Sequence, residues 1–470
     1  MDIKSKTLLS NTLIYGIGNF GSKILSFGLL PLYSYFLTRE EFGYYDIIVT
    51  TVTLLVPLIT LQLSEAIFRW LIIPDKDESS NFHTITNGFL LVFFNIIFIS
   101  FVGIMGYLIY PLKYHLFIIL LLITSSIFPV IQQSIRGFGK NKLYATSGVI
   151  YSVILLVTTV VLLIFFDLSI LALIIASIFA SSFSIIFLIS QFNVFKYFRF
   201  DFYRKDFAIE LLSYSWPLIP NTISWWLVNS ANKYIILIFL GTAANGIFAF
   251  SSRLPAVLVM INSIFNLAWQ ESVILNYSKK DNFQFFKMIF DNMTKIYFSV
   301  AIILILYSKE IITLLLSNTF FEAWKYMPFL VLGVVMSAFA GFYGTFYLAE
   351  KKTAKLFYTT LAGGAVNIII SLLFIREYGL YAVSFGTFLG FCVIFITRFI
   401  SFKSHLKPDI HYLLISILVF SFLIIQIDNN LLKHILSAIM TILVIVINLE
   451  QINKIKRLLF KKGKRLLIKR

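Results

Sequence analysis

Three basic side chains fall inside long apolar segments of this sequence: Lys23, Lys233 and Arg253. A cation in the hydrocarbon layer costs several kcal/mol unless it faces protein or water, so such residues usually mark an ion or ligand pathway. Lys233 and Arg253 lie at a similar depth, roughly 11–12 Å from the outer ends of their predicted helices at 1.5 Å per residue. No acidic residue lies near them in the sequence, so they predict an anion-binding cavity. The alternative is that carbonyls or a distant acid bind them, or that they reach the membrane surface.

Amide and aromatic residues recur at helical spacing in the same segments. The faces of predicted segments 11–37 and 212–240 carry the following residues: Asn19 and Ser26, then Asn221, Trp225, Asn229 and Asn232. Amides bind the hydroxyl groups of sugars, and aromatic faces stack on sugar rings. These residues therefore predict a sugar-binding surface. The alternative is hydrogen bonding between helices, at about 0.6 kcal/mol per bond.

Acidic, cysteine and histidine residues offer less chemistry. Glu65 lies four residues before Arg69, which indicates a local ion pair, with binding of a coupling ion at Glu65 as the alternative. The one cysteine, Cys392, and five scattered histidines have no metal-ligand spacing. Paired carboxylates, a nucleophile elbow and a phosphate-binding glycine loop are also missing from the sequence. We therefore predict no catalytic residue, no metal and no cofactor.

Membrane-spanning helices must position these residues. Hydrophobic residues make up 59% of the 470 residues and charged residues 13%, with a mean hydropathy of +0.89. A soluble domain has about 25% charged residues, and a spanning helix needs about 20 apolar residues. The apolar segments predict about fourteen spans in an all-α integral membrane fold, at roughly 11–37, 44–70, 84–110, 114–135, 143–166, 168–193, 212–240, 245–275, 291–316, 326–349, 355–375, 379–402, 409–427 and 431–449.

Basic residues alternate between the predicted loops. Of the 39 Lys and Arg residues, 30 lie in the two tails and the even-numbered loops and 6 in the opposite loops. Because cytoplasmic loops carry the excess of Lys and Arg, both termini are predicted to be cytoplasmic. This placement also assigns the net charge of +17 to membrane lipids rather than to nucleic acid.

The chain repeats itself at an offset of 203 residues. Gly43 corresponds to Gly246, and the pair Phe36-Leu37 corresponds to Phe239-Leu240. A parallel repeat of six spans predicts two six-helix lobes around a central cavity. The predicted domains are an N-terminal lobe, a C-terminal lobe, two additional spans and a basic cytoplasmic tail, at 1–200, 201–407, 408–450 and 451–470.

Two stretches resemble a known family: LLSNTLIYGIGNFGSKILSFGLLPLYSYFLTREEFGYYDI and LLSYSWPLIPNTISWWLVNSANKYIILIFLGTAANGIFAFSSRL. They are similar to the polysaccharide (O-antigen and teichoic-acid type) flippases of the multidrug/oligosaccharidyl-lipid/polysaccharide exporter superfamily. Many of those proteins carry an acidic–basic pair where this chain has Asn232-Lys233.

The resemblance implies a transporter of the bacterial inner membrane rather than an enzyme. Its implied substrate is undecaprenyl diphosphate carrying an oligosaccharide, moved from the inner to the outer leaflet by alternating access. Implied partners are membrane lipids, a coupling ion (proton or sodium) and other membrane proteins of polysaccharide assembly. On this expectation Lys23, Lys233 and Arg253 hold the diphosphate, and the amides and Trp225 hold the sugars.

Three alternatives remain. A multidrug exporter of the same superfamily is expected to carry acids in its cavity for cationic drugs, whereas the buried charges here are basic. A membrane glycan polymerase or ligase needs a long outer loop, and no predicted loop exceeds about 20 residues. A non-transporting assembly scaffold would leave the buried cations unexplained.

Overall fold

The computed structural model describes residues 28–72, 78–109, 111, 113–276, 282–350, 352–403, 411–427 and 429–449. Within these residues the chain forms helices and no strands. It divides into two compact units, Met1–Ala249 and Phe250–Arg470. The boundary between these units falls inside predicted span 245–275, and the assignment of lobes to 1–200 and 201–407 stays a prediction.

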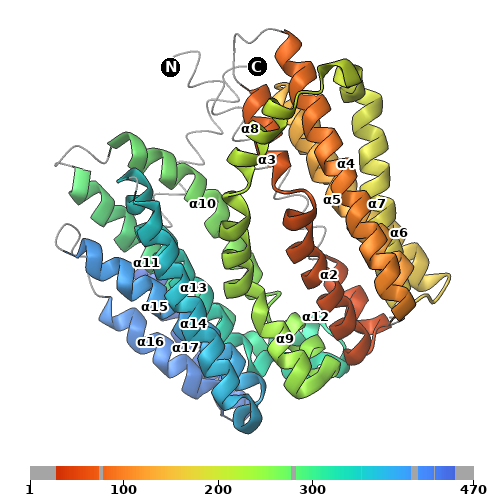
Figure 1. The fold of residues 1–470 in the computed structure, drawn as a ribbon. Helices are drawn as coiled ribbons and strands as arrows, with labels where there is room; N and C mark the ends of the chain where they lie inside the picture. The colour runs from red at the N-terminus through yellow and green to blue at the C-terminus, as the bar shows by residue number, and fades with distance from the viewer. Residues whose placement is uncertain are drawn as a thin grey trace, which may run out of the picture. The chain divides into compact units, whose positions relative to one another are not determined.

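The first unit begins with a helical segment at 28–36. Its further helices are α2 (Arg39–Ile59), α3 (Leu63–Leu71), α4 (Glu78–Ile109), α5 (His115–Gly137), α6 (Asn141–Ile164), α7 (Ile170–Gln191), η1 (Val194–Tyr197), η2 (Phe200–Phe202), α8 (Lys205–Ser215) and α9 (Leu218–Ser251). The helices of the second unit are α10 (Pro255–Asn276), α11 (Asn282–Leu306), α12 (Ser308–Leu315), η3 (Asn318–Lys325), α13 (Met327–Ala349), α14 (Thr353–Tyr378), α15 (Leu380–Phe402), α16 (Tyr412–Ile424) and α17 (Asn430–Ile447) (Figure 1).

Helices cover most of the described part of every predicted span, and the prediction of an all-helical membrane fold is confirmed. Eleven helices in the described residues are long and apolar enough to cross a membrane. Their outward faces expose large apolar side chains, as on α4 at Phe94 and Phe98. Such surfaces are suited to lipid, and the chain is a multi-pass membrane protein. Its orientation and its cytoplasmic termini remain predictions.

Predicted span 44–70 consists of two helices, because α2 ends in a helix-terminating turn. The N–H of Gln62 donates to the carbonyl of Pro57 at 3.2 Å, and the N–H of Leu61 donates to that of Leu58 at 3.4 Å. This pair of bonds caps a helix through a residue with positive φ, which is Leu61 at φ 50°. Asn95 of α4 also donates to the carbonyl of Leu58, at 3.2 Å, and to that of Ile59. The interruption therefore leaves these carbonyls at the end of α2 hydrogen-bonded, and α3 begins two residues after the left-handed Leu61.

Gly241 divides α9 into two helical arms, at 218–240 and 242–251. Its φ of 82° and ψ of −177° belong to a region that only glycine adopts without strain. This position agrees with the predicted boundary between spans 212–240 and 245–275. The glycine lets two consecutive helices meet without an intervening loop.

The connection from α7 to α8 is fixed to α4 by two fully buried side chains, Thr86 and Asn87. The Thr86 hydroxyl donates to the carbonyl of Arg199 and accepts from its N–H, both at 3.1 Å. Asn87 donates to the carbonyl of Phe202 at 3.1 Å and accepts from the N–H of Arg204 at 3.0 Å. These bonds satisfy a connection that is only partly helical, and they set the position from which α8 and α9 continue.

Arg398 is a correction to the loop-by-loop charge assignment. The count of 30 basic tail and loop residues includes Arg398 with the loop that follows predicted span 379–402. The structure instead buries it inside α15, with 2% of its surface exposed. Its guanidinium donates to Thr359 Oγ1 at 3.0 Å, to Thr360 Oγ1 at 2.8 Å, and to the carbonyls of Ala340 at 2.8 Å and Leu356 at 3.3 Å. The side chain therefore joins α13, α14 and α15, because it satisfies its donors at a helix junction instead of reaching water.

Arg398→Lys is expected to lower the free energy of unfolding by about 3 kcal/mol. A lysine keeps the charge but cannot reproduce the planar arrangement of donors that reaches both neighbouring helices. Thermal unfolding in detergent, or resistance to proteolysis, measures the loss. The matched control is Arg376→Lys on the exposed face of α14, for which we expect a change under about 0.5 kcal/mol. Equal melting temperatures for the two variants would contradict the assigned role of Arg398.

Candidate functional site

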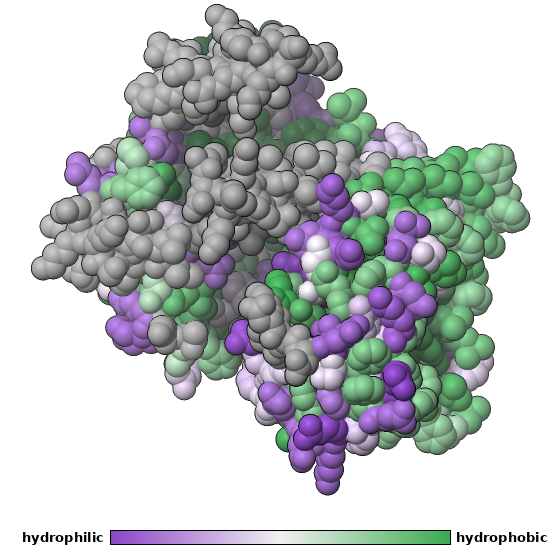
Figure 2. Space-filling model, turned by 90° about the horizontal axis from the view of Figure 1, so that it is seen from above, coloured by the Kyte–Doolittle hydropathy of each residue, from purple (hydrophilic) through white to green (hydrophobic). Residues whose placement is uncertain are grey.

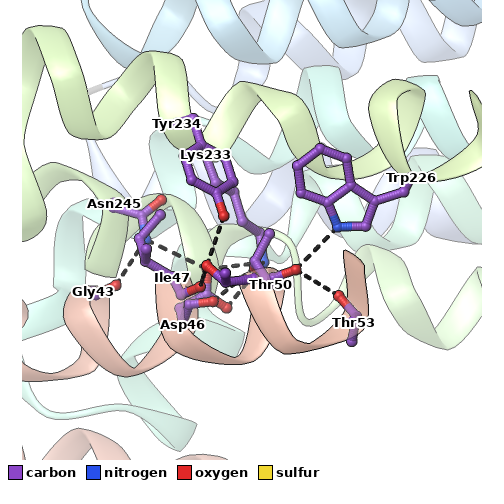
Figure 3. A network of polar contacts seen from close by, with 10 residues as sticks. Gly43, Asp46, Ile47, Thr50, Thr53, Trp226, Lys233, Tyr234 and Asn245 are labelled. Atoms are coloured by element: carbon purple, nitrogen blue, oxygen red, sulfur yellow. Dashed lines mark hydrogen bonds and ion pairs between the residues drawn. The ribbon is translucent and has the colours of Figure 1, made fainter. Parts of the chain in front are cut away.

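A buried ion pair joins α2 to the first arm of α9. The ammonium of Lys233 lies 3.0 Å from Asp46 Oδ1 and 2.8 Å from Oδ2, and it also donates to Thr50 Oγ1 at 3.1 Å (Figure 3). The side chain of Asp46 is 4% exposed and that of Lys233 is 19% exposed. At 1.5 Å per residue, Asp46 lies about 10 Å from the start of α2 and Lys233 about 12 Å before Gly241. The pair therefore lies within the span of both helices.

Further hydrogen bonds tie the same two helices together. Trp226 Nε1 donates to the carbonyl of Thr50 at 3.0 Å, and the Thr51 hydroxyl lies 2.6 Å from Tyr234 Oη. Asn245, on the second arm of α9, donates to the carbonyl of Gly43 at 2.9 Å and approaches Asp46 Oδ2 at 3.4 Å. Figure 3 shows these side chains converging on one stretch of α2. We call this set of contacts between residues 43–51 and 226–245 the α2–α9 network.

Two glycines let α2 and the second arm of α9 cross in direct backbone contact. A Cβ added to Gly43 would lie 1.8 Å from the carbonyl oxygen of Thr242, and one added to Gly246 would lie 2.1 Å from that of Arg39. Both contacts obey the repeat, since Arg39 and Gly43 correspond to Thr242 and Gly246 at the offset of 203. The crossing is thus reciprocal, as in a two-fold symmetric interface. At this crossing, the residues that the sequence repeat makes equivalent are in direct contact with each other.

The charged part of the network does not follow this symmetry. Asp46 corresponds to Ala249 and Lys233 to Leu30 at the offset of 203. The ion pair is therefore a specific addition to an otherwise repeated helix crossing. Separating a buried carboxylate from its ammonium leaves an uncompensated charge, which costs about 3–5 kcal/mol. The pair can serve as a switch between two helix arrangements, provided that another charge or a proton replaces each partner when it opens.

The predicted polar face of α9 divides into two. Asn232 is buried and interacts within the protein, whereas Trp225 and Asn229 are exposed and lie one helical turn apart. The Asn229 amide donates to the carbonyl of Trp225 at 2.7 Å, and its amide oxygen accepts no hydrogen bond from the residues that the structure describes. Asn229 lies about 18 Å before Gly241 along the helix, near the centre of a hydrocarbon layer about 30 Å thick. An exposed amide at this depth indicates a water-filled or ligand-filled space rather than lipid.

Other predicted site residues lie elsewhere or cannot be placed. Lys23, Asn19 and Ser26 lie outside the described residues, and the side chain of Asn221 is not described. Arg253 lies in the turn between α9 and α10, is half-buried and has an interaction partner. It belongs to the second unit while Lys233 belongs to the first. Its shared depth with Lys233 stays a prediction.

Glu65 and Arg69 each have a different partner from the one the sequence suggests. Glu65 accepts a hydrogen bond from Gln133 Nε2 of α5 at 3.1 Å. The Arg69 guanidinium lies over the ring of Tyr214, 5.1 Å from its centroid. The i, i+4 ion pair is therefore not formed, and each side chain instead contacts a group on a neighbouring helix. A role for Glu65 in ion coupling stays a prediction.

Lys233 has the distant acid that the sequence left open as an alternative. Asp46 is 187 residues away in the chain, so spacing could not identify it as the partner. The signal for Asp46 is its position, since an acidic residue follows the start of a spanning helix by seven residues. Asn245 and Thr50 carry no comparable signal. In the part of the chain that the structure describes, no group of three or more His, Cys, Asp and Glu side chains could hold a metal ion.

Comparison with known proteins places these features in a family. A family model described as "Polysaccharide biosynthesis protein" matches residues 8–274, which is more than half of the chain and includes the whole α2–α9 network. No curated protein sequence matches significantly.

Solved structures share the fold at low sequence identity. The lipid II flippase MurJ in an inward closed conformation superposes with a TM-score of 0.69 and 16% identity, over 94% of this chain and 100% of the other. An inward-facing multidrug resistance MATE family transporter of the MOP superfamily gives 0.62 and 12%, over 83% and 94%. A mutant of the Vibrio cholerae MATE transporter VcmN gives 0.53 and 14%, over 84% and 98%. This chain is thus similar in fold to membrane flippases and exporters.

Proposed function

Since this chain belongs to the polysaccharide biosynthesis protein family, we propose that it is a flippase for a lipid-linked oligosaccharide. The substrate is undecaprenyl diphosphate that carries an oligosaccharide repeat unit. The protein moves it from the cytoplasmic to the outer leaflet of the bacterial inner membrane, for O-antigen, capsule or teichoic-acid type surface polysaccharide. The likeness in fold to a lipid II flippase supports the same class of substrate.

The observation that carries the proposal is the exposure of Trp225 and Asn229 near the middle of α9. A glycan attached to a lipid must cross the hydrocarbon layer with its hydroxyl groups hydrogen-bonded. An exposed amide next to an exposed indole provides a bond for a hydroxyl and a flat apolar surface for a sugar ring. Both lie on the arm of α9 that also carries Lys233 in the α2–α9 network.

In this proposal Lys233 exchanges partners during transport. In the arrangement described, Asp46 neutralises the ammonium. When α2 and α9 separate, the diphosphate of the substrate takes the place of the carboxylate, and a proton taken up by Asp46 neutralises the acid. Each charge then keeps a partner in both arrangements, which avoids the penalty of an unpaired buried charge. The segment Asn232-Lys233 has no acidic residue that could bind a coupling ion. In this proposal Asp46 takes that role.

Replacing Trp225 and Asn229 together by alanine is expected to reduce export about tenfold or more, with little effect on folding. Both side chains are exposed, so their removal creates no core cavity. The measurement is surface polysaccharide in cells that depend on this protein, with the amount of protein in the membrane measured in parallel. The matched control is Ile238→Ala, an exposed apolar position on the same arm. Normal export by the double variant would remove the assigned sugar-binding role of this face.

Lys23→Ala tests the part of the proposed site that lies outside the described residues. Loss of export at a normal protein level would support a role in binding the diphosphate. Normal export would exclude Lys23 from that role.

A further inference from the structure

An apolar groove opens between α4 and α5 and is covered at one end by the connection from α7 to α8. Its volume is about 470 Å³. It is lined by Phe89, Leu90, Val92, Phe93, Ile96, Ile123, Ile127, Val130, Ile131, Phe195, Phe198 and Phe200. None of these side chains carries a polar group. The groove therefore suits a hydrocarbon chain and offers no bond to a sugar.

The connection that covers the groove also carries an exposed cation. Phe195 and Phe198 line the groove, whereas the ammonium of Lys196 lies over the rings of Phe192 and Tyr197, at 5.7 and 4.7 Å. The ammonium of Lys140, which follows α5, lies 5.8 Å from the same Phe192 ring. Two cations thus lie over one aromatic ring, and Lys196 directly follows the groove-lining Phe195 in the chain.

These two lysines have room for an anion. Both side chains are exposed, and the ion pairs found in the described part of the chain involve neither of them. The loops that carry them are predicted to be cytoplasmic. Figure 2 shows hydrophilic side chains gathered beside a hydrophobic flank on the face seen from above. The connection from α7 to α8 therefore carries both groove-lining rings and an exposed cation, on a side of the chain predicted to be cytoplasmic.

We infer that this groove binds an anionic phospholipid of the cytoplasmic leaflet, with an acyl chain between α4 and α5 and its phosphate at Lys140 and Lys196. Basic residues at the membrane surface favour anionic headgroups, and aromatic side chains favour the interface. A lipid-linked oligosaccharide is a poorer occupant, because the lining offers its sugars no hydrogen bond. The bound lipid contacts the same connection that Thr86 and Asn87 hold against α4. It is thus a second lipid site, separate from the substrate surface proposed on α9.

Native mass spectrometry of the purified full-length protein tests this inference. Dilauroyl phosphatidylglycerol and dilauroyl phosphatidylcholine are titrated separately in detergent. We expect the anionic lipid to bind more tightly, and the double variant Lys140→Gln/Lys196→Gln to weaken that binding about 10- to 30-fold. Binding of the zwitterionic lipid is expected to change less than twofold. The matched control is Lys113→Gln/Lys309→Gln, which removes two lysines that also lie over aromatic rings, at Tyr114 and Trp324.

A second variant tests the groove. Leu90→Trp places a larger side chain in the lining, and we expect it to exclude the lipid while Lys140 and Lys196 remain. Equal weakening by the control pair, equal affinity for the two lipids, or full binding by Leu90→Trp would each overturn the inference. So would a result in which undecaprenyl phosphate, tested in the same titration, binds through Lys140 and Lys196 while phosphatidylglycerol does not. Because binding is measured without transport, these outcomes are independent of the proposed flippase activity.

Discussion

Asp46→Asn is expected to slow oligosaccharide flipping at least tenfold and to lower the free energy of unfolding by on the order of 3 kcal/mol. The amide keeps the size of the side chain and can still accept a bond from Lys233, but it removes the negative charge. Lys233, which is mostly buried, then lacks a counter-charge. Flipping in liposomes and chemical unfolding in detergent measure the two effects. The control is Glu322→Gln, which breaks the exposed Glu322–Lys325 pair and is expected to change stability by under about 0.5 kcal/mol.

The double variant Asp46→Asn/Lys233→Met separates a structural role from a transport role. Because it removes both charges, we expect it to recover a large part of the stability lost in Asp46→Asn. Flipping is expected to stay at least tenfold reduced, because the ammonium that receives the diphosphate is missing. A double variant that flips at the normal rate would show that the pair only stabilises the fold. A double variant no more stable than Asp46→Asn would contradict the ion pair itself.

Gly43→Ala and Gly246→Ala are each expected to lower the free energy of unfolding by about 3 kcal/mol. A methyl group at either position would meet a backbone oxygen at 1.8 or 2.1 Å, so the two helices must move apart. The variants should also reduce flipping, since α2 and the second arm of α9 can no longer cross in direct backbone contact. The double variant Gly43→Ala/Gly246→Ala is expected to lose less free energy of unfolding than the two single variants together, because one separation of the helices relieves both clashes.

Gly106→Ala is the matched control for the glycine crossing. It lies within α4 with nothing within 4 Å of an added Cβ, and alanine is favoured over glycine in a helix by about 0.5–1 kcal/mol. We therefore expect an unchanged or slightly raised stability. Losses of equal size in Gly43→Ala and Gly106→Ala would contradict the close approach of α2 and α9.

The fold could be predicted from the sequence because hydropathy and charge alternation act locally. Each span carries its own apolar segment, and the eleven described helices that are long and apolar enough to cross a membrane overlap these segments. The repeat was also visible, since Gly43 and Gly246 occupy equivalent positions at the offset of 203. Equivalence does not imply contact, however, so the direct crossing of these two glycines emerged only from the structure.

The candidate site was predicted only in part, because its partners are distant in the chain. Lys233 was identified as a buried cation, but Asp46 belongs to another helix and lies 187 residues away in the chain. Arg398 was assigned to a loop, because counting charges cannot show that threonines and carbonyls of two other helices satisfy it. The residues of the predicted polar face of α9 also differ in exposure, which the prediction did not distinguish. Helical periodicity groups Asn229 with Asn232, whereas in the folded chain Asn232 is buried and Asn229 is exposed.

The most direct measurement uses purified protein in liposomes that contain an undecaprenyl-diphosphate-linked oligosaccharide. An impermeant glycosidase reports how fast the sugar reaches the outside, in the wild-type protein and in the Asp46→Asn and Trp225→Ala/Asn229→Ala variants. Several glycans, both protein orientations, proton and sodium gradients and a panel of cationic drugs are included. We expect protein-dependent exposure of the sugar that both variants reduce at least tenfold. No exposure of any glycan, together with transport of a cationic drug, would contradict the proposed flippase and indicate an exporter of small molecules.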